Sequence, residues 1–384
     1  MSRTTTARAS RRSLLLALPL TAALALAACS SSGGGSSSSA APTSSGASTS
    51  SGAPTSSAAP APGPLTTIRL GYFPNLTHAP ALVGTQQGLF KNALKEVNAT
   101  VTPTIFNAGP DVVTALFANS LDCSYIGPNP TVNAYVQSAG EAVRVVSGAA
   151  SGGAALVVRP EINAPADMKG RTFASPQLGN TQDVAFRAWL KEQGLTTTTE
   201  GGGDVSIKPQ SNAEGLAAYG SGAIDGAWVP EPWVSEYVAA GAKVLVDEKS
   251  LWPNGTFVTT QIICRTAFIA EHPDAVKALL KGHLAALDSI EADPAAAKES
   301  FSLALSALTG TAPKPEILDK AWDQVAFVYN PLSATLVKSA GDAVAVGLLD
   351  QAEIDAAGGL PGSLYDLTLL NEVLTEAGKP TVAS

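Results

Sequence analysis

Five short segments that each follow a predicted strand carry the residues that could bind a ligand, and four of them contain uncharged polar side chains. The segments are 73–78, 107–110, 127–130, 176–181 and 229–233. Because ligands of open α/β sheets bind beyond the carboxyl ends of the strands, we expect these segments to share one cleft. Several of them lead into helices, and a helix N-terminus offers unpaired N–H donors and a partial positive charge. The expected chemistry is therefore the binding of a small anion such as a sulfonate, nitrate, carboxylate or phosphate.

The segment Gly179-Asn180-Thr181-Gln182 is the strongest single candidate for an anion site. Glycine lets a ligand approach the backbone closely. Asn180 or Thr181 can cap the following helix or donate a hydrogen bond to a ligand. A capped turn without a ligand is the alternative interpretation, and the sequence leaves both open.

The segment Trp228-Val229-Pro230-Glu231-Pro232-Trp233 is the second candidate. Its two tryptophans and two prolines would form a rigid, partly apolar wall that could hold a ring or an alkyl tail. Glu231 could accept hydrogen bonds from a ligand amine or close an ion pair between domains. The alternative for Trp228 is a place in the core.

Polar residues from the other three segments complete the predicted ligand-binding set. They are Tyr72, Asn75, Thr77, His78, Asn107 and Asn129. Neutral donors at these places suit a small polar or anionic ligand. For a lone histidine such as His78, a hydrogen bond to a helix end is the more common role.

The sequence lacks the motifs of metal-dependent and hydrolytic enzymes. Its three histidines form no HExxH motif, and it contains no P-loop and no paired-cysteine motif. Asp122 and Asp225 come at strand starts, away from the expected cleft, so we expect structural roles for them. No nucleophile stands with a base. The sequence therefore predicts a protein that is not an enzyme, with no catalytic residue, metal site or cofactor.

Strands that alternate with helices must position these segments. Short apolar runs alternate with helical patterns from Ile68 to Arg159, and a new unit begins near Pro160. Ser211 and Glu214 have the spacing of a capping box. From His272 onward the pattern is mostly helical. The alternation predicts the α/β class with parallel sheets.

The start of the chain carries an export pattern. A basic beginning and an apolar run predict a signal peptide over residues 1–28. Cys29 follows Leu26-Ala27-Ala28, a context that resembles a bacterial lipobox, so Cys29 is the predicted lipidation site. An ordinary signal peptide with a chance cysteine is the alternative, and Sec and twin-arginine export both stay open.

Residues 29–64 are mostly Ser, Gly, Ala, Thr and Pro, which predicts a disordered tether. With a lipid on Cys29, the protein would be anchored to the cell membrane at its extracytoplasmic face.

Charge narrows the range of partners. Since four of the 24 basic residues lie within residues 1–28, the remaining chain has 20 basic and 32 acidic residues, a net charge of −12. Such an acidic chain is a poor nucleic-acid binder and has no polybasic membrane patch. No second apolar run approaches the length of a membrane span.

Taken together, these residues resemble the nitrate, sulfonate, taurine and bicarbonate substrate-binding proteins of ABC importers, a family with relatives that bind thiamin-precursor pyrimidines. The resemblance covers residues from about Ile68 to Val246 well and the rest in outline. The segments that carry it are Leu70-Gly71-Tyr72, Asn107-Ala108-Gly109-Pro110, Leu121-Asp122 with Gly127, Asp167-Met168-Lys169-Gly170-Arg171, Gly179-Asn180-Thr181, and Ile224-Asp225-Gly226-Ala227-Trp228 with Glu231-Pro232.

The resemblance implies a two-lobed periplasmic-binding-protein type II fold with two hinge strands. Lobe 1 would comprise residues 65–155 plus 262–384, and lobe 2 residues 156–261, with hinges near 153–156 and 260–263. In that fold the returning strand runs antiparallel beside the third strand of lobe 1. Cys264 would then lie near Cys123, either in a disulfide or as one of two buried thiols.

The resemblance also implies a function, which is binding of a solute between the lobes and delivery to the transmembrane subunits of an ABC permease. An aliphatic sulfonate, taurine or nitrate is the expected solute, and a monomer is expected. The alternatives are a receptor for a pyrimidine or other heterocycle, a surface scaffold without a ligand, and a biosynthetic enzyme on the same fold.

Overall fold

The structure is a computed structural model, and it describes residues 65–383. The predicted signal peptide, the lipidation site Cys29 and the tether lie outside these residues. Among residues 65–383, no helix combines the length and the apolar composition that crossing a bilayer requires.

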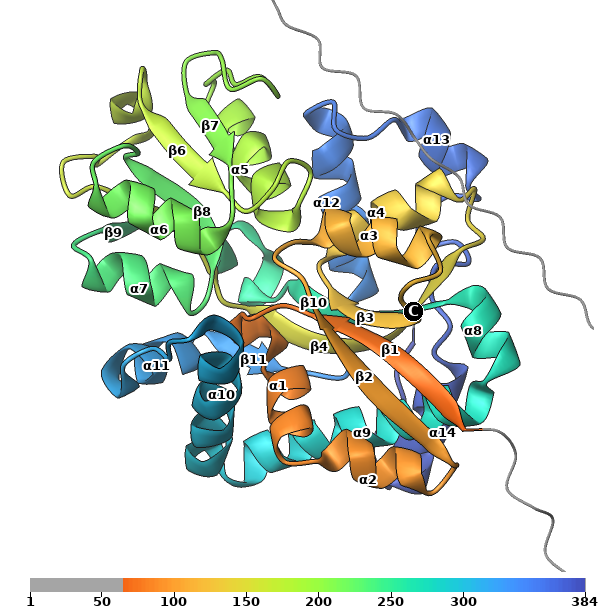
Figure 1. The fold of residues 1–384 in the computed structure, drawn as a ribbon. Helices are drawn as coiled ribbons and strands as arrows, with labels where there is room; N and C mark the ends of the chain where they lie inside the picture. Colours follow the sequence, from red (N-terminus) through yellow and green to blue (C-terminus); the bar gives the residue numbers. More distant parts are fainter. Residues whose placement is uncertain (1–64, 384) are drawn as a thin grey trace, which may run out of the picture. The chain divides into compact units, whose positions relative to one another are not determined.

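A six-stranded mixed sheet forms the centre of the first lobe (Figure 1). In spatial order its strands are β11 (Val325–Phe327), β4 (Val143–Gly152), β10 (Val258–Arg265), β3 (Cys123–Ile126), β1 (Thr66–Tyr72) and β2 (Ala99–Ile105). β1 runs parallel to β2 and β3, whereas β10 runs antiparallel to both of its neighbours. Both predicted parallel sheets are in fact mixed, because β10 runs antiparallel to its neighbours in the first sheet and β5 (Ala154–Val158) runs antiparallel to its neighbours in the second.

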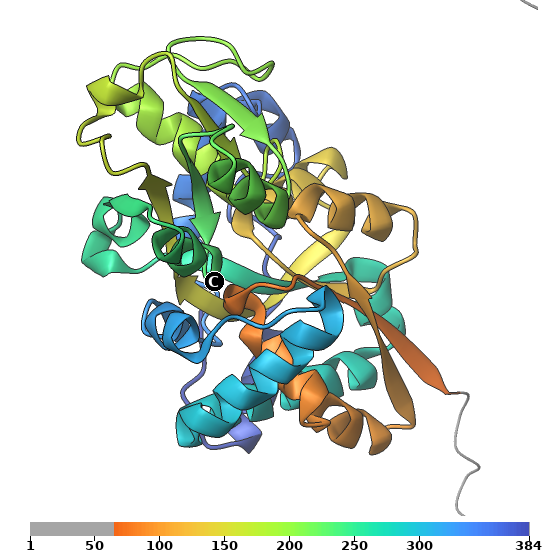
Figure 2. The same cartoon turned by 60° about the vertical axis from the view of Figure 1, so that its left-hand side comes forward.

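A five-stranded sheet forms the centre of the second lobe, drawn in green shades in Figures 1 and 2. In spatial order its strands are β7 (Ser206–Pro209), β6 (Thr172–Ser175), β8 (Gly226–Pro230), β5 (Ala154–Val158) and β9 (Lys243–Asp247). The sequence analysis missed β7 and β9. Both are edge strands of four or five residues with little apolar alternation, so their pairing rather than their pattern defines them.

Helices cover both sheets. Those of the first lobe are α1 (Ala79–Gln86), α2 (Leu89–Lys95), α3 (Gly109–Phe117), α4 (Pro128–Gln137), α8 (Thr266–Glu271), α9 (Pro273–Ala292), α10 (Pro294–Thr309), α11 (Pro315–Trp322), α12 (Ser333–Ala345), α13 (Gln351–Ala356) and α14 (Thr368–Glu376). Those of the second lobe are α5 (Thr181–Glu192), α6 (Asn212–Gly220) and α7 (Trp233–Ala239). Short 3-10 helices are η1 (Leu76–His78), η2 (Pro165–Met168), η3 (Glu248–Leu251) and η4 (Pro253–Gly255). α6 begins with the predicted capping box, since the Ser211 hydroxyl accepts from the Glu214 backbone N–H.

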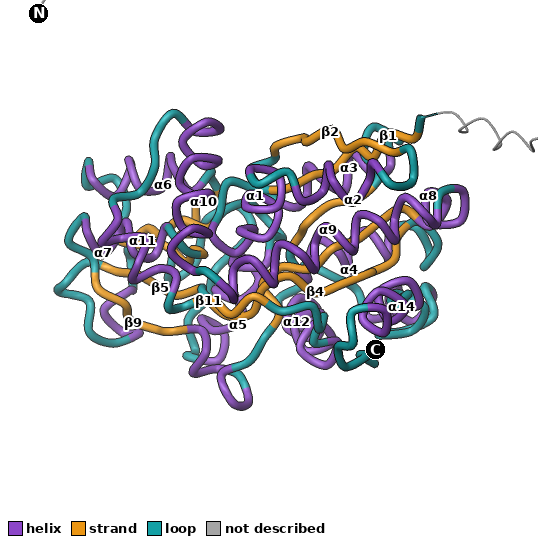
Figure 3. Tube along the Cα trace, turned by 90° about the horizontal axis from the view of Figure 1, so that it is seen from below, coloured by secondary structure: helices purple, strands orange, loops and turns teal. Residues whose placement is uncertain are grey.

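Apolar residues on the two faces of the first sheet form separate cores. One core joins the sheet to α1, α2, α9 and α14, and Figure 3 shows α9 running between α2 and α14. The other joins the opposite face to α3, α4 and α12. Because helices cover both faces of the sheet, the central strand β10 is buried along almost its whole length, including its polar residues Thr259, Thr260 and Gln261.

The chain crosses between the two sheets twice. The first crossing is at Gly153, where φ is +71° and a Cβ would lie 2.4 Å from the Val325 Cγ2 atom. The second runs from β9 through η3 and η4 to β10. Because Val258 already pairs with Ser151 in the first sheet, this crossing lies before Val258 and not at the predicted 260–263.

Ionic groups fix the strand starts at the ends of the sheets away from the lobe boundary. The Asp122 carboxylate accepts hydrogen bonds from Arg69 Nε at 2.8 Å and Arg265 Nη2 at 2.9 Å. The Asp225 carboxylate accepts from Arg171 Nη1 and the Thr172 backbone N–H, both at 3.0 Å. The structural roles expected for both aspartates agree with these contacts.

Cys123 and Cys264 face each other in the register of β3 and β10 and form a disulfide. The bridge joins positions 141 residues apart in the chain. It therefore links the strand that enters the first lobe's centre to the strand that returns from the second lobe.

We predict that replacing both cysteines by alanine lowers the free energy of unfolding by about 2–5 kcal/mol, because a cross-link over a long loop constrains the unfolded chain. Denaturant unfolding of wild type and variant measures this difference. Reductant should destabilise the wild type and leave the double variant unchanged. Mass spectrometry of an unreduced digest provides a direct check, and the absence of a Cys123–Cys264 linked peptide would contradict the bridge.

Candidate functional site

A small cavity of about 20 Å³ lies where loops of the two lobes meet. The residues that line it are uncharged polar, apolar or glycine residues: Phe73, Asn75, Thr77, His78, Asn107, Gly127, Pro176, Asn180, Thr181, Gln182, Asn212, Pro230 and Thr259. Seven of the thirteen residues predicted from the sequence are in this set. We call this space the head cavity.

Several helices begin at residues of the head cavity. His78 is the N-cap of α1, Gly127 that of α4 and Asn180 that of α5, while Asn212 is the first residue of α6. All four helices have at least eight residues. Their first turns place unpaired N–H groups and partial positive charge around the cavity, which favours an anion.

One hydroxyl oxygen and one amide oxygen among the residues that line the head cavity have no hydrogen-bond partner. They are Thr181 Oγ1 and Asn212 Oδ1, and both residues are more than nine-tenths buried. A buried polar atom without a partner costs free energy. A ligand with hydrogen-bonding groups would remove part of that cost for the Thr181 hydroxyl, which can donate.

His78 contributes a neutral imidazole. Its Nδ1 accepts from the Phe73 backbone N–H at 3.3 Å, so the proton of the neutral ring resides on Nε2. Burial lowers the pKa of His78 to about 3. The side chain therefore offers an N–H donor without a formal charge.

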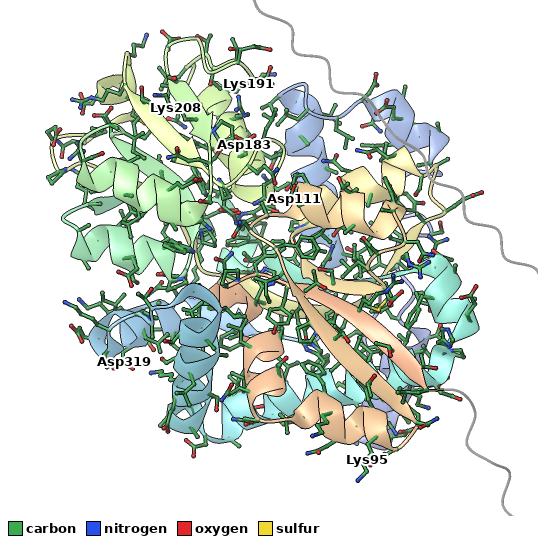
Figure 4. The ribbon with its side chains drawn as sticks, viewed as in Figure 1. Lys95, Asp111, Asp183, Lys191, Lys208 and Asp319 are labelled. Atoms are coloured by element: carbon green, nitrogen blue, oxygen red, sulfur yellow. A yellow bond between two sulfur atoms is a disulfide. The ribbon has the colours of Figure 1, made fainter. Side chains whose placement is uncertain are left out.

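The α5 N-terminus is held by a buried carboxylate. Asp183 accepts from Ser175 Oγ at 2.7 Å and from the Gly179 backbone N–H at 3.0 Å. Arg187 Nε donates to the same carboxylate at 2.9 Å. Figure 4 labels Asp183 on α5 and Asp111 on α3, which approach the lobe boundary from opposite sides.

Beside the head cavity the lobes contact each other through neutral groups, whereas further away Lys191 Nζ donates to the Ala345 carbonyl and Gln177 Nε2 to the Asp111 carboxylate. The Leu76 backbone N–H donates to the Glu231 carbonyl at 2.9 Å, and Trp233 Nε1 donates to Asn75 Oδ1 at 2.8 Å. The Gly109 backbone N–H donates to Asn180 Oδ1 at 3.3 Å. The structure thus shows the lobes closed over the head cavity.

Six predicted ligand residues are not among those that line the head cavity, and four of them lie in a core, a helix or a turn. Tyr72 and Trp228 belong to the cores of the first and second lobes, and Trp228 Nε1 donates to the Glu248 carboxylate at 2.7 Å. Asn129 lies inside α4 and donates to the Ser339 carbonyl. Gly179 has φ +74° and forms the turn before α5 without lining the cavity. Tyr72 and Trp228 are not in the cavity because side chains alternate between the two faces of a strand, and theirs point into a core.

Glu231 and Trp233 border larger grooves. Glu231 is buried, and its carboxylate accepts from the Ser235 backbone N–H and hydroxyl, both at 3.0 Å. Burial raises the pKa of Glu231 to about 7. Trp233 lies on a groove of about 650 Å³ that also includes Asn75, Asn107 and Asn212.

The sequence analysis missed Asn212 and Thr259 as cavity residues. The Ser211–Glu214 capping box marked the start of α6, but the strand before it was not recognised, so its first residue was not assigned to the cleft. Thr259 belongs to β10, and its position follows only from the return of that strand into the first sheet.

Comparison with known proteins identifies a family. A sequence model described as the NMT1-like family matches residues 61–305. The taurine-binding periplasmic protein of Escherichia coli (strain K12) is 30% identical over 200 residues, which is 52% of this chain and 60% of that protein. This chain thus spans less than two thirds of that relative's length.

Solved structures share the fold. The periplasmic nitrate-binding protein NrtA from Synechocystis PCC 6803 superposes with a TM-score of 0.68 at 17% identity, covering 82% of this chain and 90% of that one. The alkanesulfonate-binding protein SsuA from Xanthomonas axonopodis pv. citri, bound to MOPS, gives 0.61 at 21% identity, covering 74% and 95%. The two-lobed periplasmic-binding-protein fold predicted from the sequence is confirmed by these structures.

Lobe closure should depend on the absence of a side chain at Gly127. A Cβ there would lie 2.3 Å from Thr181 Oγ1 across the lobe boundary. We predict that Gly127→Ala lowers the free energy of unfolding by about 1–3 kcal/mol, because overpacking forces the lobes apart.

The double variant Gly127→Ala/Thr181→Ala removes the clashing oxygen and should recover much of this loss. Denaturant unfolding of both variants measures the effect, and X-ray scattering reports the separation of the lobes. A double variant as unstable as the sum of its single variants would contradict the proposed contact.

Glu231 should make stability depend on pH. A carboxyl whose pKa is raised on folding contributes stability that is full below its unfolded pKa, and this stability is lost as the pH rises through its folded pKa. We predict that Glu231→Gln gains on the order of 3 kcal/mol relative to the wild type between pH 4.5 and 8. Unfolding curves across this range test it, with the exposed Glu316→Gln as control. A constant difference between Glu231→Gln and wild type would argue against a buried, protonated Glu231.

Proposed function

The chain belongs to the NMT1-like family, and on that premise we propose that it is the solute receptor of an ABC importer, which binds a small sulfonate-type anion between its two lobes. The main support for this proposal is the composition of the head cavity. Both lobes supply its uncharged donors, and four helices begin at its wall.

An anion is the ligand that such a wall favours. Partial positive charges at helix ends attract a negative group, and the hydroxyl, amide and imidazole donors can satisfy its oxygens. An ammonium group would find no carboxylate among the residues that line the head cavity. The sequence relative is named a taurine-binding protein, and taurine carries a sulfonate, so we place a sulfonate in the head cavity.

Binding requires the lobes to open. The head cavity of about 20 Å³ has room for one water-sized molecule and not for a sulfonate. The ligand would therefore enter an open form, and the lobes would close around it at a wider spacing than in this structure. A ligand that binds the closed form better than the open form shifts the population towards closure.

The proposal also includes the location of the protein in the cell and its partners. The predicted signal peptide, lipidated Cys29 and the tether over 29–64 would keep the receptor at the extracytoplasmic face of the cell membrane. The closed form would deliver the solute to the transmembrane subunits of the permease. The function is binding without chemistry, and the receptor acts as a monomer.

Calorimetric titration tests which anionic group binds in the head cavity. We expect methanesulfonate to bind more tightly than nitrate, bicarbonate and acetate, and methylammonium and pyrimidine not to bind. Thr181→Val removes one donor and should weaken methanesulfonate binding about 10-fold or more, since a hydrogen bond to a charged group is worth about 1.5–3 kcal/mol.

The matched control is Thr100→Val on the edge strand β2, which should bind methanesulfonate as the wild type does. Binding of pyrimidine alone would favour the heterocycle receptor. If none of these solutes binds or raises the melting temperature, the proposed function is wrong.

A further inference from the structure

Each of the two crossings between the lobes carries a buried carboxyl group. The Glu231 backbone N–H donates to the Gly153 carbonyl at 2.7 Å, which places Glu231 at the first crossing. Glu248 is the first residue of η3 and belongs to the second crossing. Glu231 is 1% exposed and Glu248 is 2% exposed, and neither residue lines the head cavity.

The hydrogen-bond donors to both carboxyls are neutral. Glu231 accepts from the Ser235 backbone N–H and hydroxyl, and Glu248 accepts from Trp228 Nε1 at 2.7 Å. Within residues 65–383, neither carboxyl forms an ion pair, whereas the buried Asp183 pairs with Arg187. A buried carboxyl without a cation is more stable in its protonated form, because the ionised form loses its hydration.

A helix of the first lobe covers Glu231. This carboxyl lines a groove of about 600 Å³, which we call the hinge groove, together with Gly153 and Asp247 from the two crossings. The opposite wall of the hinge groove is α11, which contributes Ile317. α11 packs on α7, and Figures 1 and 3 both show these two helices side by side. Separation of the lobes would therefore open the hinge groove to water.

Another helix of the first lobe covers the second crossing. Trp252, which follows η3, hydrogen-bonds to Glu248 as Trp228 does. The Lys338 ammonium of α12 lies 4.4 Å from the centre of the Trp252 ring. Removal of α12 from this ring on opening would expose the indole that shields Glu248.

The charged groups that face the two carboxyls are of both signs. They are Asp247 on β9, Lys249 on η3 and Lys314, Glu316 and Lys320 on α11 for Glu231, and Lys338 and Asp342 on α12 for Glu248. Glu236, the charged residue of α7, lines the neighbouring groove instead. Since these charges oppose one another, burial has the largest effect and raises the pKa of Glu231 and that of Glu248 to about 7.

We propose that closure of the lobes takes up protons at Glu231 and Glu248, so that acid favours the closed form and the open form prevails above neutral pH. In the open form water reaches both carboxyls, and their pKa returns towards the ordinary value of about 4.3. A proton that binds the closed form more tightly shifts the population towards closure as the pH falls. This inference goes beyond the proposed function and holds for any solute.

X-ray scattering of the ligand-free protein between pH 5.5 and 8.5 tests the inference, with circular dichroism to verify that the chain stays folded. Each carboxyl should raise the ratio of closed to open protein about 20-fold or more from pH 8.5 to 5.5. We expect a smaller radius of gyration at pH 5.5 than at pH 8.5. An equal radius at both pH values would overturn proton-linked closure, and this measurement needs no variant and no ligand.

Two substitutions assign the protons. Glu231→Gln and Glu248→Gln keep the size of the side chain and cannot ionise, so each should weaken the pH dependence and the double variant should stay compact at pH 8.5. The matched control is Glu316→Gln, an exposed carboxyl on the far wall of the hinge groove, which should change with pH as the wild type does. A double variant that opens at high pH as the wild type does would assign the effect to other groups.

Calorimetric titration with methanesulfonate, which does not titrate in this range, gives a second measurement. In two buffers of different ionisation enthalpy at pH 7.5, the wild type should take up protons on binding and the double variant should not. Binding without proton uptake by the wild type would contradict the inference. If methanesulfonate does not bind, the proposed function fails, and the scattering series decides the inference by itself.

Discussion

Helix N-termini around a cavity of uncharged side chains are the feature on which the rest of this structure depends. Helix ends attract an anion strongly only when water is excluded and the ends are fixed in place. The carboxyl ends of the strands bring α4, α5 and α6 to the same boundary. The aspartates that bind arginine at strand starts, Asp122 and Asp225, lie at the opposite ends of the sheets. These two clusters thus stabilise the lobes away from the head cavity, whereas the buried Asp183–Arg187 ion pair lies at the start of α5 and fixes that helix end.

The contacts that join the lobes beside the head cavity are neutral and weak, which suits lobes that must open and close. Two hydrogen bonds to the loop after β1, from Leu76 to Glu231 and from Trp233 to Asn75, hold the closed form. Such bonds contribute about 1 kcal/mol each, so ligand binding can outweigh or replace them. Gly127 and Gly153 also allow the lobes to close. Because they have no side chain, backbone and side chains of the two lobes can approach closely at these positions.

The sequence predicted what kind of site this is better than it predicted which residues line it. Loops after strands, glycine turns and helix starts are local signals, and they identified Asn75, Thr77, His78, Asn107, Asn180, Thr181 and Gln182 as residues of one cleft. Tyr72 and Trp228 were placed there because they end or belong to strands near the same loops, but which face of a strand points to the core depends on register. Asn212 required the edge strand β7, whose four residues carry no clear pattern. The antiparallel return of β10 was expected only from the family resemblance.

In the C-terminal part, too, the sequence predicts the elements but not how they pack. Prolines and amphipathic patterns predict its helices, yet nothing local places the segment 305–317 against α6 and α7. That contact joins positions about a hundred residues apart and depends on how α10 packs on α1 and how α11 packs on α7. The head cavity follows from strand ends and helix starts, which the fold brings together in any chain that adopts it.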